Sequence, residues 1–497
     1  MAKLREIIDL CKDGQIQETY QLAKADLDAV PTDPWNHRKL AWVLNYLMKE
    51  DAETGNYLDL IAHLDELKTL DQLSIPQDNI LFDNILFKIG SFVNKHAAPT
   101  DIDTPAKLST FFLKLRDYSF EPSKGYSFLL QSFIKCGGWQ EMADFLDWWN
   151  LDNLTVEDYT PFKMNNGKTI MSLAERAFIA KSKALLRLND LGRIEEFLPE
   201  MDTLMEKHPE MTYPGYFYGK LLLSLGSNAD EALKVIVPFA RKKATEFWVW
   251  QLLSDVFVNE PDKQLACLLR AVHCHTQESF LGKVRIKLAQ FYIQQNRQDL
   301  AKYQIDKITQ CYLSQGWHLP GEVDRWVHEP WINNVVSSNQ DPVNYQAITD
   351  AILCEGSEEA IAIVTHVDQN THRATLIYGM KKRMTQKLRI KVAPGAVLKI
   401  NYILDSGGNP RVLSAGKTQF SSNLDFAKVV DGLVMKRDEW AFAFLHYNNE
   451  KAFISPNTLK KYNVSDGELV KALVVFDFNP KKDKWDWTCV SINKNKQ

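Results

Sequence analysis

The sequence predicts a multidomain α-then-β chain, in which a long helical region is followed by two small β-barrels. Through about residue 330, apolar residues recur at the three- and four-residue spacing of amphipathic helices. From Glu359 onward the pattern changes to short alternating runs such as AIAIVTHV, RATLIYGM and LVKALVVF. Nine such runs, with Gly, Asn and Asp between them, are typical of two small barrels.

Length and composition support a division into several domains. A chain of 497 residues is too long for one typical domain, and 45% apolar with 25% charged residues is ordinary for globular proteins. The segment 332–358 includes the polar stretch NNVVSSNQDPVNY and predicts a linker between the helical and the β regions.

The first region, residues 1–95, predicts helical hairpins. Apolar residues at helical spacing begin at Leu4, a break follows at Gly14, and PTDP ends a second helix near Val30. LAWVLNYLMKE then begins another helix, and the polar stretch 94–104 predicts an exposed connection.

Residues 105–331 contain a repeated pattern. WQLLSDVF, which begins at Trp250, follows the W-x2-L-G-x2-Y frame of the tetratricopeptide repeat (TPR). The second helix of each hairpin needs a small residue where it crosses the first, and alanines recur at intervals of 34 and 35 residues. These alanines are Ala232, Ala266 and Ala301. The region therefore resembles a TPR-like α-solenoid, with three degenerate repeats over about 211–313.

Three tryptophans lie between the predicted hairpins, at Trp139, Trp148 and Trp149. We interpret them as large packing residues. A binding groove lined by these rings is the alternative.

Charge is distributed unevenly along the chain. From Glu359 to the end there are 22 Lys and Arg against 13 Asp and Glu, a balance of +9, whereas residues 1–358 carry 37 against 50, a balance of −13. Such asymmetry is expected when one part binds a polyanion and the other does not.

The stretch WAFAFL, at 440–445, places three rings at alternating positions. Alternate residues of a strand share one face, so Trp440, Phe442 and Phe444 are expected on the same side. Exposed rings bind single-stranded nucleic acid with little sequence preference, because every base has a π-face. Alternatively, the rings form the barrel core; Ala441, Ala443 and Leu445 are small enough to fill the inward face instead.

The segment 427–493 resembles a cold-shock-type OB barrel, in particular the RNA-binding domain of transcription termination factor Rho. The motifs that carry the resemblance are GLVMK (432–436), WAFAFL (440–445), AFISP (452–456) and TLKKYNVSDGELV (458–470). The resemblance implies that Phe442, Phe444 and Phe453 stack on bases, with Trp440 extending this surface. Nearby lysines are expected to attract phosphates, namely Lys451, Lys460, Lys461, Lys481, Lys482 and Lys484.

The segment 359–418 resembles a second, more divergent OB-type barrel. Its basic run KKRMTQKLRIK contains Lys381, Lys382 and Arg383, which are expected either to contact phosphates or to form a solvated charge run. Helical repeats followed by two such barrels loosely resemble the repeat and cold-shock-like proteins of TOTE-type conflict systems.

The sequence indicates no catalytic or cofactor chemistry. SAGKT at 414–418 lacks the first glycine of a phosphate-binding loop, because Arg411 stands there. Cys267 and Cys274 with nearby histidines do not form a metal-binding spacing. No apolar run reaches about 18 residues, and the seven cysteines form no CxxC pair. A cytoplasmic protein without a metal, a cofactor or a membrane segment is expected.

Together these patterns predict a non-catalytic adaptor. Its barrels would bind single-stranded RNA or DNA, with RNA favoured, and its helical solenoid would dock a protein partner. Two alternatives stay open: a protein-interaction scaffold whose barrels bind no nucleic acid, and an unrecognised nuclease or defence effector.

Overall fold

The computed structural model describes residues 3–226, 229–405, 407–422, 424–480 and 482–493. The chain divides into two compact units, Met1–Phe239 and Ala240–Gln497. As predicted, the N-terminal part is helical and a closed β-barrel lies in the C-terminal part. Among the described residues, no helix combines the length and the apolar character needed to cross a membrane.

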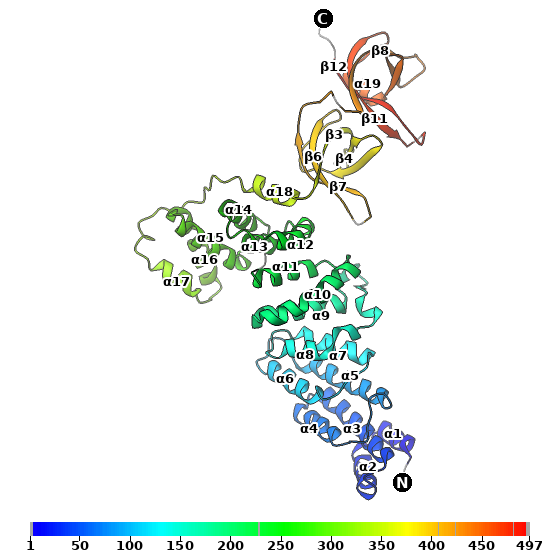
Figure 1. Cartoon of the computed structure of the whole chain (residues 1–497), viewed down its shortest axis with the longest axis vertical. Helices are drawn as coiled ribbons and strands as arrows, with labels where there is room; N and C mark the ends of the chain where they lie inside the picture. The colour runs from blue at the N-terminus through cyan, green and yellow to red at the C-terminus, as the bar shows by residue number, and fades with distance from the viewer. Residues whose placement is uncertain (1–2, 227–228, 406, 423, 481, 494–497) are drawn as a thin grey trace. The chain divides into compact units, whose positions relative to one another are not determined.

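The first unit is built of helices that pack in successive layers (Figure 1). α3 packs on α5, α5 on α7, and α7 on α9. The bounds are α1 (Leu4–Lys12), α2 (Ile16–Ala29), α3 (Pro34–Thr54), α4 (Tyr57–Lys68), α5 (Asn79–His96), α6 (Thr104–Leu115), α7 (Lys124–Lys135), α8 (Met142–Trp149), α9 (Leu173–Leu188), α10 (Leu191–Lys207) and α11 (Pro214–Ser224). Short 3₁₀ turns (Leu151–Asn153 and Val156–Tyr159) and a small hairpin of β1 (Phe162–Lys163) and β2 (Thr169–Ile170) lie between α8 and α9.

Local sequence explains both ends of α3. Asp33 accepts a hydrogen bond from the backbone N–H of Trp35, and Pro34 occupies the first helical turn, where its missing N–H costs nothing. Gly55 ends the helix in the left-handed conformation, with φ of 81°. The PTDP motif therefore separates α2 from α3 and also supplies the residues that start α3.

The tryptophans of the first unit are mainly packing residues. Trp139 and Trp149 are buried, and Trp148 is half-buried. Trp149 stacks on Tyr126 with ring centroids 4.2 Å apart. In the same cluster, Phe145 stacks on both Phe133 and Trp149. The packing interpretation is therefore confirmed for Trp139 and Trp149.

The second unit begins with further helix pairs. α13 (Phe247–Val256) packs on α14 (Pro261–Val272), and α15 (Gly282–Gln294) packs on α16 (Gln298–Ser314). The other elements here are α12 (Ala229–Lys242), which contains the boundary between the units, the 3₁₀ turn Glu278–Phe280, and α17 (Gly321–Val327). Ala266 and Ala301 are completely buried, as a close crossing requires. The assignment of these pairs to the TPR family stays a prediction.

Ala266→Leu and Ala301→Leu are each expected to lower the free energy of unfolding by about 1–3 kcal/mol, because a larger side chain overpacks the crossing. Ala347→Leu, at an exposed position, is the matched control and should leave stability nearly unchanged. Thermal melts of the three variants test this. Unchanged melting of both buried-site variants would show that the repeat frame is misplaced.

The predicted linker 332–358 carries a helix, α18 (Tyr345–Cys354). Asn344 caps it by accepting a hydrogen bond from the backbone N–H of Ala347. The helix packs on α14, where Tyr345 stacks on His273 at 4.7 Å. Ile352 and Leu353 are buried. A helix of ten residues is too short to be stable alone, so the packing against α14 supplies the remaining stability.

A five-stranded antiparallel sheet follows, in the order β5-β4-β3-β6-β7. Its strands are β3 (Glu358–Val367), β4 (Arg373–Gly379), β5 (Lys382–Lys387), β6 (Val397–Leu404) and β7 (Pro410–Lys417). The two edge strands are joined by one side chain. The amide of Gln386 on β5 donates to the carbonyl of Val412 on β7 at 2.9 Å and accepts from its N–H at 2.9 Å. The sheet thus curls toward closure, whereas its assignment as an OB-type barrel stays a prediction.

The last module is a closed barrel in the order β10-β12-β11-β8-β9. It consists of β8 (Ala427–Met435), β9 (Ala443–Tyr447), β10 (Glu450–Ile454), β11 (Leu469–Asn479) and β12 (Lys484–Asn493), with α19 (Pro456–Tyr462) after β10. β10 and β12 pair in parallel, and the other pairs are antiparallel. The prediction of a small closed barrel in this segment is confirmed.

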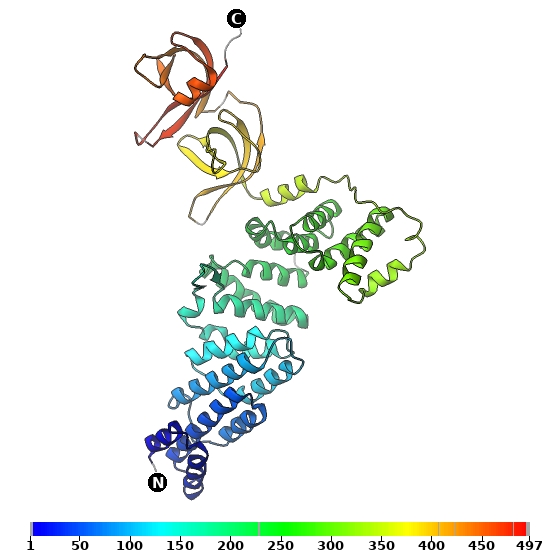
Figure 2. The ribbon, with the colours of Figure 1, turned by 180° about the vertical axis from the view of Figure 1, so that it is seen from behind.

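Within the second unit, the sheet and the barrel lie next to each other (Figure 2). An apolar layer joins them. Ile363 of β3 and Ile377 of β4 are both fully buried, although they lie outside the core of their own sheet. They pack with Leu473 and Val475 of β11 and with Val490 of β12. This layer explains why β3 and β4 have nearly continuous apolar runs: both faces of these strands are buried.

Candidate nucleic-acid interface

At the start of β9, residues 442–445 point alternately to the outer surface and to the core of the barrel. Ala443 and Leu445 are 0% exposed and belong to the barrel core. Phe442 and Phe444 are half-buried and lie outside that core. The small residues therefore fill the barrel, which leaves the rings on its outer surface. Ala441, which was expected to help fill the inward face, is exposed.

A two-residue turn places the two ring-bearing strands in register. Asn448 and Asn449 both have positive φ, of 44° and 61°, as a type I′ hairpin turn requires. The turn sets Phe444 directly opposite Phe453. Because directly paired residues point to the same side of a sheet, both rings face outward together.

Trp440 reaches the rings from a turn instead of from the strand. β9 begins only at Ala443, and the backbone N–H of Trp440 donates to the carbonyl of Arg437 at 2.9 Å. This turn interrupts the alternation predicted for 440–445. The indole nevertheless stacks on Phe442, with centroids 5.0 Å apart and planes 16° apart.

Trp440, Phe442, Phe444 and Phe453 thus form one four-ring cluster. Phe453 lies 5.6 Å from Phe442 and 6.2 Å from Phe444 between ring centroids. Met435 of β8 pairs with Phe444. Met435 is 45% exposed and extends the apolar surface. The cluster unites all four ring residues named from the sequence.

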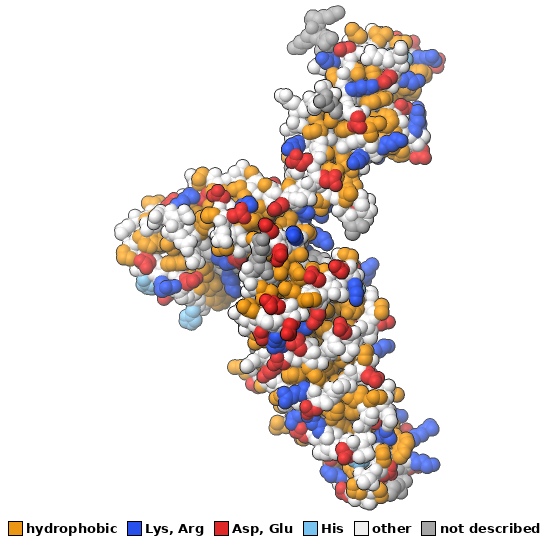
Figure 3. Space-filling model, viewed as in Figure 1, with side chains coloured by type: hydrophobic (Ala, Val, Ile, Leu, Met, Phe, Trp, Pro, Cys, Tyr) orange, Lys and Arg blue, Asp and Glu red, His pale blue; other side chains and the backbone are white. Residues whose placement is uncertain are grey.

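Two cations lie over the cluster. The guanidinium of Arg437 is 4.8 Å from the ring centroid of Trp440, and the ammonium of Lys451 is 5.3 Å from that of Phe444. Cations over ring faces are attracted by the ring quadrupole. Arg437 was not named from the sequence, although it stands only three residues before Trp440. Over the barrel, at the top of the view, Figure 3 shows Lys and Arg side chains beside hydrophobic ones.

The other predicted lysines of the barrel are divided between two places. Lys460 and Lys461 are exposed in the last turn of α19, directly after the strand that carries Phe453. Lys482 and Lys484 lie near the β11–β12 turn, where Lys484 pairs with Asp486 at 2.8 Å. Lys481 lies outside the described residues.

The basic hairpin of the sheet lies near the barrel. Lys381 is in the β4–β5 turn with φ of 57°, and Lys382 begins β5. Arg383 pairs with Asp477 of β11 at 3.4 Å. That carboxylate partly neutralises Arg383, while Lys381 and Lys382 are exposed.

A second group of rings on the β11–β12 hairpin was not predicted. Phe476 stacks on Trp485 with centroids 6.1 Å apart, and Trp487 lies edge-on to Phe476 at 5.5 Å. The ammonium of Lys428 is 4.3 Å from the Trp487 centroid. The alternating rings of VVFDF and KWDW would have indicated a paired ring-bearing hairpin.

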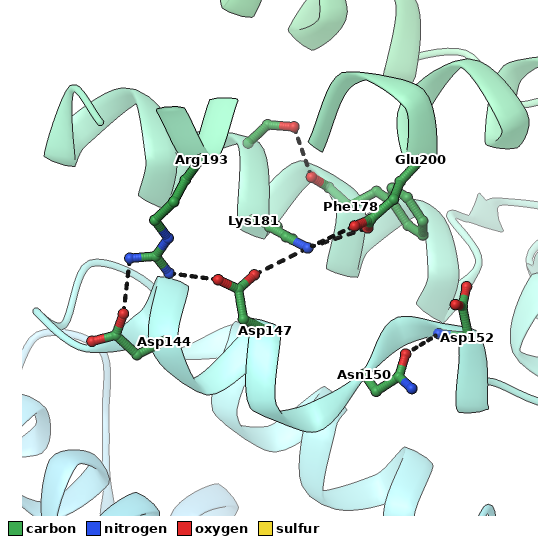
Figure 4. A network of polar contacts seen from close by, with 9 residues as sticks. Asp144, Asp147, Asn150, Asp152, Phe178, Lys181, Arg193 and Glu200 are labelled. Atoms are coloured by element: carbon green, nitrogen blue, oxygen red, sulfur yellow. Dashed lines mark hydrogen bonds and ion pairs between the residues drawn. The ribbon is translucent and has the colours of Figure 1, made fainter. Parts of the chain in front are cut away.

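The first unit contains a polar network that joins α8, α9 and α10 (Figure 4). Lys181 lies between Asp147 at 3.1 Å and Glu200 at 3.2 Å, and Arg193 pairs with Asp144 at 2.8 Å and with Asp147 at 2.7 Å. Each of these carboxylates has a cationic partner, so the network holds helices together. Within the described part of the chain, no three His, Cys, Asp or Glu side chains are grouped as metal ligands would be.

The last module is thus a closed five-stranded barrel with aromatic rings on its outer surface. Residues 428–492 match the family model of S1/CSD-like domain 2 of the TOTE conflict systems. Residues 212–351 match a domain of unknown function, DUF7017, which begins just before α11 and ends within α18. A comparison with curated proteins gave no match. The predicted likeness to cold-shock-type and TOTE proteins is thus confirmed for the barrel, whereas the likeness to Rho stays a prediction.

Proposed function

We propose that the chain binds single-stranded nucleic acid, with RNA favoured, through the four-ring cluster of the C-terminal barrel. The observation that carries this proposal is the outward position of the rings. Ala443 and Leu445 fill the core, and four rings gather on the surface under two cations. A surface of this kind binds unpaired bases by stacking, at about 1–3 kcal/mol per base.

The basic residues around the cluster supply the second part of the interaction. Lys451 lies over the rings, and Lys460 and Lys461 follow the same strand on α19. Phosphates that pass these side chains would displace condensed counterions, so binding should weaken steeply as salt rises. The family name of the matched domain, S1/CSD-like domain 2 of the TOTE conflict systems, supports a role in such a system.

We further propose that the chain is a non-catalytic adaptor whose helical part docks a protein partner. Residues 1–358 carry a net charge of −13, which disfavours a polyanion on the helices. The basic β region would then hold the nucleic acid and the acidic region would hold the partner. Pull-down with residues 359–497 removed from the bait, compared with the full chain, tests whether the helical part binds the partner: the shortened bait should retain it.

Lys460→Ala with Lys461→Ala is expected to weaken binding to single-stranded RNA and to reduce the slope of log K against log salt by about 1.4, which corresponds to two phosphates. Fluorescence anisotropy of the full chain, over a series of salt concentrations, measures this slope. Lys163→Ala with Lys168→Ala removes the same charge from an exposed hairpin of the helical unit and is the matched control. Equal slopes for the two double variants would contradict the assigned phosphate contacts.

A further inference from the structure

A cavity of about 270 Å³ lies in the second unit between helix and sheet. The end of α12 and the helix α18 form one wall, and β5 with β7 forms the other. Its charged lining consists of Arg241, Lys387, Arg389 and Arg411 against one carboxylate, Asp350. We call it the arginine cavity. Four cations against one anion leave an excess of positive charge facing a small space.

Arg241 is fixed by backbone groups. Its Nε donates to the carbonyl of Leu353 at 2.7 Å, and its Nη2 donates to the carbonyl of Glu355. Both carbonyls lie at the C-terminal end of α18, so the guanidinium caps that helix. Burial lowers the pKa of Arg241 from its usual value.

Arg389 and Arg411 are held weakly. The Nη1 of Arg389 is 3.5 Å from the carboxylate of Asp350, and the Nη2 of Arg411 is 3.5 Å from the carbonyl of Arg241. Both distances are at the outer limit for a hydrogen bond. Both side chains are exposed, so they can turn toward a ligand without breaking a strong contact.

The shape and chemistry of the cavity favour a phosphate group. Guanidinium groups present paired N–H donors that match phosphate oxygens, so a cluster of arginines is typical of phosphate recognition. The volume is below the range of about 300–1,000 Å³ that drug-sized ligands occupy. No aromatic side chain is among the described lining residues, so the cavity has no ring on which a base could stack.

We propose that the arginine cavity binds a phosphate group through Arg389 and Arg411, with Arg241 fixed beneath them. The phosphate is either one unit of a nucleic-acid backbone or the phosphate of a small molecule. This site is separate from the four-ring cluster, and its first test does not depend on nucleic-acid binding.

The test compares the full chain with two double variants. Arg389→Gln with Arg411→Gln removes both exposed arginines of the cavity and leaves Lys387 in place. Lys391→Gln with Lys417→Gln removes the same charge from neighbouring exposed positions outside it. Calorimetric titration with inorganic phosphate, at constant ionic strength set by chloride, is expected to show at least tenfold weaker binding for the arginine variant only. Arg411→Lys, which keeps the charge but not the paired donors, should bind with intermediate affinity.

A second titration, with single-stranded RNA, identifies the source of the phosphate. If the backbone occupies the cavity, the arginine variant loses RNA affinity and its salt slope falls by about 0.7, the value for one phosphate, relative to the lysine variant. If a small molecule supplies the phosphate, the RNA isotherms of the two variants coincide while phosphate binding differs. Equal phosphate binding together with equal RNA binding in all proteins would overturn the proposal. Loss of the four-ring cluster leaves phosphate binding intact, which keeps the two proposals distinguishable.

Discussion

Replacing Phe442 and Phe444 together with alanine is expected to weaken binding of single-stranded nucleic acid by about 2–6 kcal/mol, if each ring stacks on one base. The two rings lie at the centre of the four-ring cluster, since each is within about 6 Å of Phe453 and Trp440. Their removal also leaves Lys451 without the ring that it covers. Fluorescence anisotropy with the full chain measures the loss.

The same double variant should keep the barrel folded, because both rings lie outside the core. Leu445→Ala is the matched control on the same strand, with the opposite expectation. Leu445 is completely buried, so its truncation should cost about 2–5 kcal/mol of stability. Circular dichroism and thermal melts separate the two effects. A folded double-Phe variant that binds RNA as tightly as the parent would refute the ring interface.

Trp149→Ala is expected to destabilise the first unit by about 3–5 kcal/mol, the cost of truncating a large buried ring. Trp149 is 2% exposed and lies between Tyr126, at 4.2 Å, and Phe145, at 5.4 Å between centroids. The surrounding rings cannot all move into the space, so a cavity would remain. Denaturant unfolding followed by tryptophan-independent circular dichroism measures the change.

The neighbouring variant Trp148→Ala provides the comparison. Trp148 is half-buried, so its replacement should lower the free energy of unfolding by less than the replacement of Trp149, although Trp148 also contacts Phe112 and Phe145. Neither variant should alter RNA affinity, since both residues lie in the helical first unit. Equal stability of Trp149→Ala and the parent would mean that these rings do not form the core described above.

The period of the apolar residues was sufficient to predict the helical and β regions, but it left open which side of β9 faces inward. Ala443 and Leu445 could be recognised as core residues, because a narrow barrel accepts only small or medium side chains there. The Asn448–Asn449 turn is also local, and it fixes which ring faces which. Local chemistry thus predicts the elements and part of the interface.

Contacts between distant segments could not be predicted in the same way. Arg383 is one of six cations in the basic run 381–391, and nothing in that run indicates that Asp477 would neutralise it. Helix α18 depends on packing against α14, which precedes it by more than seventy residues. The arginine cavity likewise combines Arg241 with Arg389 and Arg411, which come together only in the folded chain. Each of these features depends on tertiary structure.

The apolar layer between the sheet and the barrel makes the two β modules mutually dependent. Ile363 and Ile377 are as deeply buried as any core residue, yet they cluster with residues of the barrel, such as Val475. Fully burying such a side chain is worth about 1.5–3 kcal/mol, and separation of the modules would return this surface to water. The two modules are therefore expected to unfold together. Recombination could transfer the sheet and the barrel together between proteins. Either module alone would expose its part of the apolar layer and would tend to aggregate.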